Sequence, residues 1–235
     1  RLCSAYRPQG NMGRRRFMRA PMEKNVTGMD ELLAGYAAGT LSYPAQALVG
    51  AHLELSDRNR GYVSSLESLA GAGLDDTDPV DLSDRDAFLS TVFNADPGDL
   101  NDNAPRADVH PSVPESLRTI VGSSIDELPW KTLLPGVREC KLGEIDGCDS
   151  SLLWVRAGRA MPSHTHHGTE LTLVLQGGFS DQDGHYVTGD VAFADGDIDH
   201  KPVADDGEDC ICFAVTAGRL ELTGPVGRWF APFMR

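Results

Sequence analysis

The sequence predicts an α + β protein built from two separate domains: a small N-terminal bundle of about four helices, followed by a β-barrel or sandwich. Three observations support this division. Apolar residues recur at helical spacing between residues 30 and 94, whereas short runs rich in Val, Leu, Phe and Thr, separated by Gly and Asp turns, dominate after residue 115. The segment between them is rich in proline and acidic residues and has almost nothing apolar to bury.

The composition predicts a soluble chain that carries a strong negative charge. The 235 residues are 40% hydrophobic, enough for at least one core, and no apolar run approaches the roughly 18 residues of a membrane span. Residues 1–21 hold six arginines and no acidic residue, which leaves 15 basic against 35 acidic residues, a formal charge of −20, for the rest. Such a field disfavours direct binding of nucleic acid and favours a basic partner.

The basic head, residues 1–21, resembles a twin-arginine export signal in the stretch "GRRRFMRAP". Such a signal needs an apolar stretch next, but Pro21, Glu23 and Lys24 stand there instead. We therefore expect a disordered tail on a cytoplasmic protein. The five cysteines are an odd number at no framework spacing, which favours reduced thiols over a disulfide scaffold.

The helical domain is expected over residues 22–94. Its first three helices are indicated by apolar residues at helical spacing: Leu32, Leu33, Tyr36 and Ala37; Leu48, Ala51, His52 and Leu55; Tyr62, Val63, Leu66 and Leu69. Ser42, ahead of Pro44, is placed to begin the second helix, and Ser56 or Asp57 to cap the third. The pattern "SDRD" makes Ser83 the expected N-cap of a fourth helix, which continues into an apolar run at residues 88–93.

Residues 95–114, "ADPGDLNDNAPRADVHPSVP", have the composition of a linker, and we expect few packing contacts between the domains that it joins. The β-domain is expected over residues 115–235. Its strands are indicated by the runs "LLWVRAG", "LTLVLQGGFS", "VAFADGD" and "DCICFAVTAG".

A cluster of histidines and a carboxylate lies in this β-domain. His164 and His166 are two apart, so on an extended segment both imidazoles point to one face. Glu170 follows after a turn, and His200 lies beyond another strand. Three imidazoles and a carboxylate suit one divalent ion, for which we favour zinc, with manganese, iron and nickel as alternatives.

These residues resemble the two motifs of the cupin family. The first motif, G-x5-H-x-H-x3-E-x6-G, is complete: Gly158, His164, His166, Glu170 and Gly177. The second motif, G-x5-P-x-G-x2-H-x3-N, is met at Gly189 and His200, while Asp195, Asp197 and Ala204 replace its Pro, Gly and Asn. The resemblance implies a double-stranded β-helix, or jelly-roll barrel, whose metal ligands are His164, His166, Glu170 and His200.

Over residues 30–235 the chain is similar to the ChrR-type anti-sigma factors, two-domain bacterial regulators. The resemblance rests on "DELLAGYAAGTLS" and "ALVGAHLELS", followed by an acidic linker and a cupin that ends in "DCICFAVT". It implies a helical domain that holds zinc and clamps an extracytoplasmic-function sigma factor, and a cupin domain that carries a second metal and takes part in the response to a signal.

The zinc ligands of that family's helical domain are mostly missing. The family pattern His-x3-Cys-x2-Cys reads His52-x3-Ser56-x2-Asn59 in this chain, and Thr27 takes the place of an earlier histidine. A hydroxyl and an amide are poor substitutes for the thiolate and imidazole donors of a closed structural zinc site. We therefore expect a degenerate, zinc-free site in which His52 packs between helices.

Cys210 and Cys212 form a C-x-C pair whose thiols lie on one face of a strand. They are candidate redox thiols near the cupin mouth, which would require a lowered pKa and some exposure. The alternative is a pair of buried small hydrophobic residues, which is how free cysteine commonly behaves.

The leading hypothesis is a non-enzymatic, cytoplasmic transcription regulator. Its helical domain would sequester an extracytoplasmic-function sigma factor, and its metal-binding cupin would sense a small molecule or oxidative stress. One alternative is a metal-dependent cupin enzyme of dioxygenase or isomerase type, for which Glu139, Lys141 or Glu144 could supply an acid or base beside the ion. Another is a zinc-free sensor whose helices bind a different partner.

Overall fold

The computed structural model describes residues 28–81, 83–95, 113–122, 124–166, 168–194, 201–217 and 220–222, with backbone alone at 166 and 220–222. The predicted tail and nearly all of the predicted linker lie outside these residues, so the domain boundaries stay a prediction. Among the described residues, none of the helices has both the length and the apolar character needed to cross a membrane.

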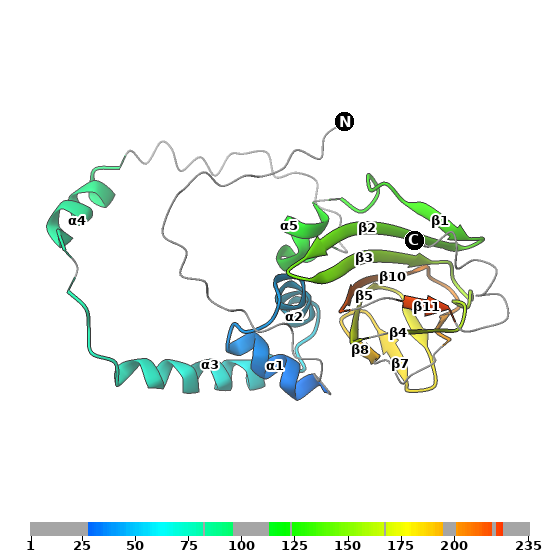
Figure 1. The fold of residues 1–235 in the computed structure, drawn as a ribbon, viewed down its shortest axis with the longest axis horizontal. Helices are drawn as coiled ribbons and strands as arrows, with labels where there is room; N and C mark the ends of the chain where they lie inside the picture. The colour runs from blue at the N-terminus through cyan, green and yellow to red at the C-terminus, as the bar shows by residue number, and fades with distance from the viewer. Residues whose placement is uncertain are drawn as a thin grey trace.

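Four helices precede the linker, as the sequence predicts, and two short helical turns follow it (Figure 1). In chain order they are α1 Met29–Ala37, α2 Tyr43–Leu55, α3 Arg60–Asp75, α4 Arg85–Phe93, the 3-10 helix η2 Glu115–Leu117, and α5 Arg118–Val121. Ser42 is the N-cap of α2, as predicted. The other two predicted caps are wrong: α3 begins after Asn59 and α4 after Asp84, and neither residue makes a side-chain capping bond.

The chain after the linker forms an antiparallel β-barrel of three sheets (Figure 1). The strands are β1 Lys131–Leu134, β2 Val137–Ile145, β3 Cys148–Val155, β4 His164–His166, β5 Glu170–Gln176, β6 Gly178–Ser180, β7 His185–Val187, β8 Val191–Ala194, β9 Val203–Ala204, β10 Cys210–Thr216 and β11 Leu220–Leu222. The large sheet has the order β1-β2-β3-β10-β5-β8, and the smaller sheets are β11-β4 and β7-β6-β9.

The large sheet has two apolar faces, because side chains alternate along each strand. Cys210 and Cys212 of β10 point to the barrel interior, whereas Ile211, Phe213 and Val215 point to the outer face. On β5, Leu171, Leu173 and Leu175 also join the outer cluster. These strands therefore read as continuous apolar runs, the pattern of strands that are buried on both faces.

Helix α2 packs on the outer face and α1 packs on α2, so one hydrophobic core includes residues from both parts of the chain. Leu32, Leu33 and Leu48 of the helices belong to the same buried cluster as Leu152 and Phe213 of the sheet. The carboxylate of Glu54 also accepts hydrogen bonds from the backbone N–H groups of Glu115 and Ser116, at 2.6 and 2.8 Å. The expectation of few contacts between the two parts was wrong, because a composition typical of a linker says nothing about how the domains pack.

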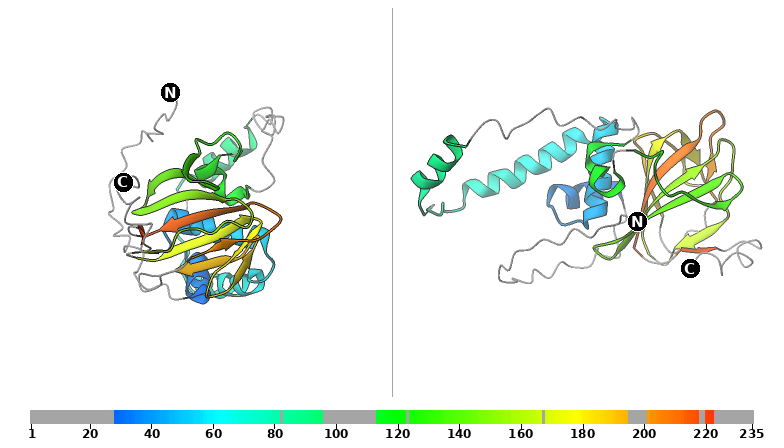
Figure 2. Two further views of the ribbon diagram at one scale, coloured as in Figure 1. Left: turned by 90° about the vertical axis from the view of Figure 1, so that its right-hand side faces the viewer. Right: turned by 90° about the horizontal axis from the view of Figure 1, so that it is seen from above.

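The two later helices lie mostly outside this core. Val63 is the one buried residue of α3, and α4 has none. Figure 2 shows both helices extending away from the barrel. Their large apolar side chains are exposed: Leu69 72%, Leu74 71%, Phe88 63%, Val92 54% and Phe93 80%. The apolar spacing correctly predicted these helices, but nothing in the described parts of the chain covers these five side chains.

Candidate functional site

The barrel encloses a cavity of about 50 Å³ beneath the inner face of the large sheet. Its wall is mainly apolar. The side chains in the wall that carry N–H, O–H, carboxyl or thiol groups are those of His164, Glu170, Thr172, Asp181, Cys210 and Cys212. Two of the four predicted metal ligands and both candidate redox thiols therefore face one cavity.

His164 is arranged as a metal-binding histidine usually is. The side chain is buried, and its Nδ1 lies 2.8 Å from the carbonyl oxygen of Pro162. Because a carbonyl can only accept, Nδ1 carries the proton and Nε2 carries the lone pair that would bind an ion. A backbone carbonyl on the second ring nitrogen is the usual way in which proteins fix the tautomer of a histidine ligand.

Glu170 begins β5 on the same cavity wall and is 6% exposed. His166 lies on β4, two residues after His164, but its side chain and the whole of His200 lie outside the described residues. Among the side chains that are described, no group of three or more His, Cys, Asp or Glu could hold a metal ion. An imidazole and a carboxylate facing one cavity nevertheless fit two members of the predicted ligand set.

The two thiols of the cavity wall are protected. Cys210 and Cys212 are buried and unbridged, and their sulfur atoms are 3.5 Å apart. The hydrogen bond to Cys210, burial and the negative charge of Glu170 all raise the pKa of Cys212 well above its ordinary value. The raised pKa of Cys212 and the burial of both thiols favour the interpretation as buried small hydrophobic residues over that of reactive thiolates.

The acid and base candidates considered for an enzyme do not reach the cavity. Lys141 and Glu144 are exposed on β2, and Glu139, whose pKa is raised by burial, is also absent from the cavity wall. The sequence reasoning missed Asp181, which follows β6 and does line the cavity. Its Oδ1 accepts hydrogen bonds from the N–H groups of Asp183 and Gly184, so this oxygen holds a turn.

The degenerate zinc motif forms a second polar cluster, at the junction of α2, α3 and the β7–β8 turn. His52 is 2% exposed, and its Nδ1 lies 2.6 Å from the carbonyl oxygen of Gly189. The amide Nδ2 of Asn59 lies 3.0 Å from the other ring nitrogen, Nε2. We expected His52 to pack between helices, and the structure adds a hydrogen bond from this histidine to the barrel.

Two more contacts close this junction. Arg58 Nη1 makes an ion pair of 2.8 Å with Asp190 Oδ1. Gly189 has φ of +90°, and a Cβ there would lie 3.2 Å from the Cβ of Leu55, so a glycine is required both by its conformation and by the close approach of α2. Ser56, the other position of the lost motif, accepts a hydrogen bond from Arg58 N at 3.4 Å.

Comparison with known proteins agrees with both parts of this architecture. The family described as ChrR Cupin-like domain matches residues 120–219. The anti-sigma-E factor ChrR of Cereibacter sphaeroides is 37% identical over 206 residues, which cover 88% of this chain and 96% of that protein. The crystal structure of Rhodobacter sphaeroides SigE in complex with the anti-sigma ChrR matches with a TM-score of 0.67 and 38% identity, over 80% of this chain and 97% of that chain. The chain therefore belongs to the family of the anti-sigma factor ChrR.

Proposed function

We propose that this chain is a cytoplasmic anti-sigma factor that sequesters an extracytoplasmic-function sigma factor through its helical domain. Its relative ChrR is an anti-sigma factor and is seen in complex with SigE. The observation that carries the proposal is the exposure of five large apolar side chains on α3 and α4, namely Leu69, Leu74, Phe88, Val92 and Phe93, and we call this part of the two helices the α3–α4 surface. Exposed large apolar side chains on helices that leave the core are typical of a protein interaction site.

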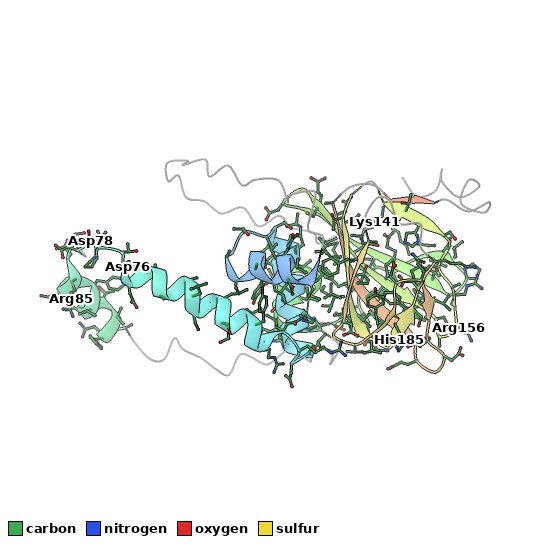
Figure 3. All side chains as sticks on the ribbon, turned by 90° about the horizontal axis from the view of Figure 1, so that it is seen from below. Asp76, Asp78, Arg85, Lys141, Arg156 and His185 are labelled. Carbon is green, nitrogen blue, oxygen red and sulfur yellow. The ribbon has the colours of Figure 1, made fainter. Side chains whose placement is uncertain are left out.

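The charge around this surface supports a basic partner. Asp76 and Asp78 lie in the segment between α3 and α4, at the end of the molecule opposite the barrel (Figure 3). Residues 22–235 together carry a formal charge of −20. Acidic residues near apolar contacts speed the encounter with a basic protein and select against acidic ones.

Binding by variants of the full chain tests this assignment. Phe88→Asp combined with Phe93→Asp should weaken binding of an extracytoplasmic-function sigma factor from the same organism by about 100-fold or more, because buried aromatic contacts often dominate interfaces. Val187→Asp is the control: Val187 is also an exposed apolar residue, at 40%, but lies on β7 of the barrel. Equal affinity of the double variant and the control would contradict the assignment.

We further propose that the cupin is a sensor domain with one divalent metal, zinc by preference, held by His164, His166, Glu170 and His200. The fixed tautomer of His164 and its place beside Glu170 in one cavity support this. A bound ion would supply a Lewis acid to which a small signal molecule could coordinate. His164 and Glu170 would orient that ion, and the apolar wall would exclude bulk water.

Metal analysis of the purified full chain tests the sensor site. We expect about one divalent ion per chain, lost when His164 and His166 are both replaced by alanine. Replacement of His185, an exposed histidine that pairs with Asp205 outside the predicted ligand set, should leave the metal content unchanged. An ion retained by the double variant, or two tightly held ions in the unmodified chain, would contradict the proposal.

The candidate redox role of Cys210 and Cys212 is best tested by alkylation. Because both thiols are buried and the pKa of Cys212 is raised, iodoacetamide should modify neither in the folded protein at neutral pH and both after unfolding. Rapid alkylation of the folded protein would restore the hypothesis of a reactive thiolate sensor.

A cupin enzyme is the second function class to consider. Thr172 and Asp181 are the polar groups of the described cavity wall besides the candidate ligands and the thiols, and Asp181 holds a turn through one oxygen. This supports ligand sensing over acid–base catalysis, because a catalytic site needs a group placed to move a proton.

A further inference from the structure

The residues at the degenerate motif do not fit the zinc ion that the family resemblance implies. Ser56 and Asn59 offer a hydroxyl and an amide in place of two thiolates. His52 could bind an ion only through a ring nitrogen, but Nδ1 is hydrogen bonded to the Gly189 carbonyl and Nε2 to the Asn59 amide. Both nitrogens are therefore used within the protein.

These two hydrogen bonds are chemically matched. The Gly189 carbonyl is an acceptor, so His52 Nδ1 donates to it, and Nε2 then accepts from the amide N–H of Asn59. A neutral imidazole thus satisfies both neighbours at once. Since His52 is 2% exposed, loss of either bond would leave a buried polar atom without its partner.

The two hydrogen-bond partners of His52, Asn59 and Gly189, each connect to an element that carries one of the proposed functions. Asn59 is the N-cap residue of α3, the helix that leads to the α3–α4 surface. The Gly189 N–H donates to the Val174 carbonyl on β5, the strand whose Glu170 and Thr172 line the cavity. Gly189 also lies two residues before β8, which adds Ala192 and Ala194 to the cavity wall.

We propose that His52, Asn59 and the Gly189 carbonyl form a metal-free junction that fixes the start of α3 against the barrel. In this chain a hydrogen-bonded bridge between domains takes the place of a zinc cluster within one domain. The orientation of the α3–α4 surface then depends on the β7–β8 turn, and so on the cavity wall to which that turn is joined. This part of the inference rests on the proposed function, which assigns the α3–α4 surface to the sigma factor.

Amide hydrogen exchange of the full chain, with no sigma factor present, tests the junction. The two amides to follow are Val63 N–H, bonded to the Asn59 carbonyl, and Gly189 N–H, bonded to the Val174 carbonyl. Asn59→Ala should speed exchange at both by about fivefold, the size expected for one net hydrogen bond. His52→Leu should have the same or a larger effect on both amides, and His52→Gln, which keeps a donor and an acceptor, should partly restore protection.

Asn59→Ala keeps the test decisive if His52→Leu fails to fold, because Asn59 is half-buried and its side chain makes no capping bond. Arg58→Ala is the matched control: it removes a contact across the same interface, but from a side chain that is 71% exposed, so exchange should change less than about twofold. Unchanged exchange at Gly189 in Asn59→Ala, or equal effects in Arg58→Ala, would overturn the proposal.

The result is independent of the proposed function, because exchange is measured without a partner. If the unmodified chain binds no sigma factor but the junction variants behave as expected, the proposed function fails and the junction stands. If the chain binds its sigma factor while Asn59→Ala leaves both amides protected, the junction fails and the proposed function stands.

Discussion

Helices α2 and α4 are both rich in apolar residues but have opposite surroundings. Eight residues of α2, from Pro44 to His52, are buried, because α1, η2 and strands β5 and β10 of the large sheet pack against the helix. No residue of α4 is buried, and its Phe88 and Phe93 are 63% and 80% exposed. Burial of a phenylalanine is worth about 1.5–3 kcal/mol. The contrast indicates that α2 stabilises the fold, whereas the apolar side chains of α4 contribute little to it and are accessible to a partner.

The comparison also shows which packing holds the helical part. A small helical domain that depends on structural zinc gains about 10 kcal/mol or more from the metal. In this chain the outer face of the sheet supplies a core for α1 and α2, through residues such as Leu152 and Phe213. The barrel therefore acts as the scaffold on which the helices fold, in addition to holding the cavity.

Removal of the barrel should produce the largest effect. A fragment of residues 28–95 would expose the side of α2 that packs on the sheet, including Leu48, which is fully buried. We expect no cooperative thermal transition from this fragment. Internal deletion of residues 78–95 is the control, and because α4 buries nothing it should shift the melting temperature of the full chain by only a few degrees. A cooperative melt of the isolated fragment would show that the helices have a sufficient core of their own.

Two single substitutions of phenylalanine by alanine, one in the core and one on α4, test the same difference between buried and exposed apolar residues. Phe213→Ala, on the outer face of the sheet, should lower the free energy of unfolding by about 3–5 kcal/mol, because the side chain is fully buried. Phe88→Ala, on α4, should change it by less than about 0.5 kcal/mol. Denaturant titration measures both values. A large loss for Phe88→Ala would mean that α4 packs on the protein itself.

Changes at two glycines should give smaller effects than Phe213→Ala, and the two effects should have opposite signs. Gly189→Ala places a Cβ against Leu55 at a φ of +90° and should destabilise the full chain by about 1–3 kcal/mol. Gly73→Ala lies in α3, where a Cβ meets nothing within 4 Å, and should stabilise the chain by up to about 1 kcal/mol. Chemical denaturation of both variants tests this, and a destabilised Gly73→Ala would place α3 against an unrecognised surface.

Much of the fold was predictable because it follows from local patterns. The change from helical to β periodicity predicted the four helices and the barrel, and the cupin motif predicted that His164 and Glu170 would share a cavity. The motif glycines have a clear physical reason: a Cβ on Gly177 would lie 2.8 Å from the Asp209 carbonyl, at a φ of +66°.

The missed features are those that depend on contacts between distant segments. Periodicity marks Leu48 and Phe88 alike as apolar, and only the tertiary arrangement decides that one is covered and the other exposed. The hydrogen bond from His52 to Gly189 joins residues 137 positions apart. Its acceptor is a backbone carbonyl, which carries no residue-type signal. Asp181 was missed because it lies in the turn after β6, and only the folded arrangement of that turn brings it to the cavity.

The central claim is that the α3–α4 surface binds the sigma factor, and a footprint of the complex tests it most directly. Hydrogen exchange of the full chain should be compared with and without an extracytoplasmic-function sigma factor from the same organism. We predict new protection across residues 60–93, which contain α3 and α4, and no change at the exposed β7 strand. Protection confined to the barrel, with α3 and α4 exchanging as in the free protein, would contradict the account.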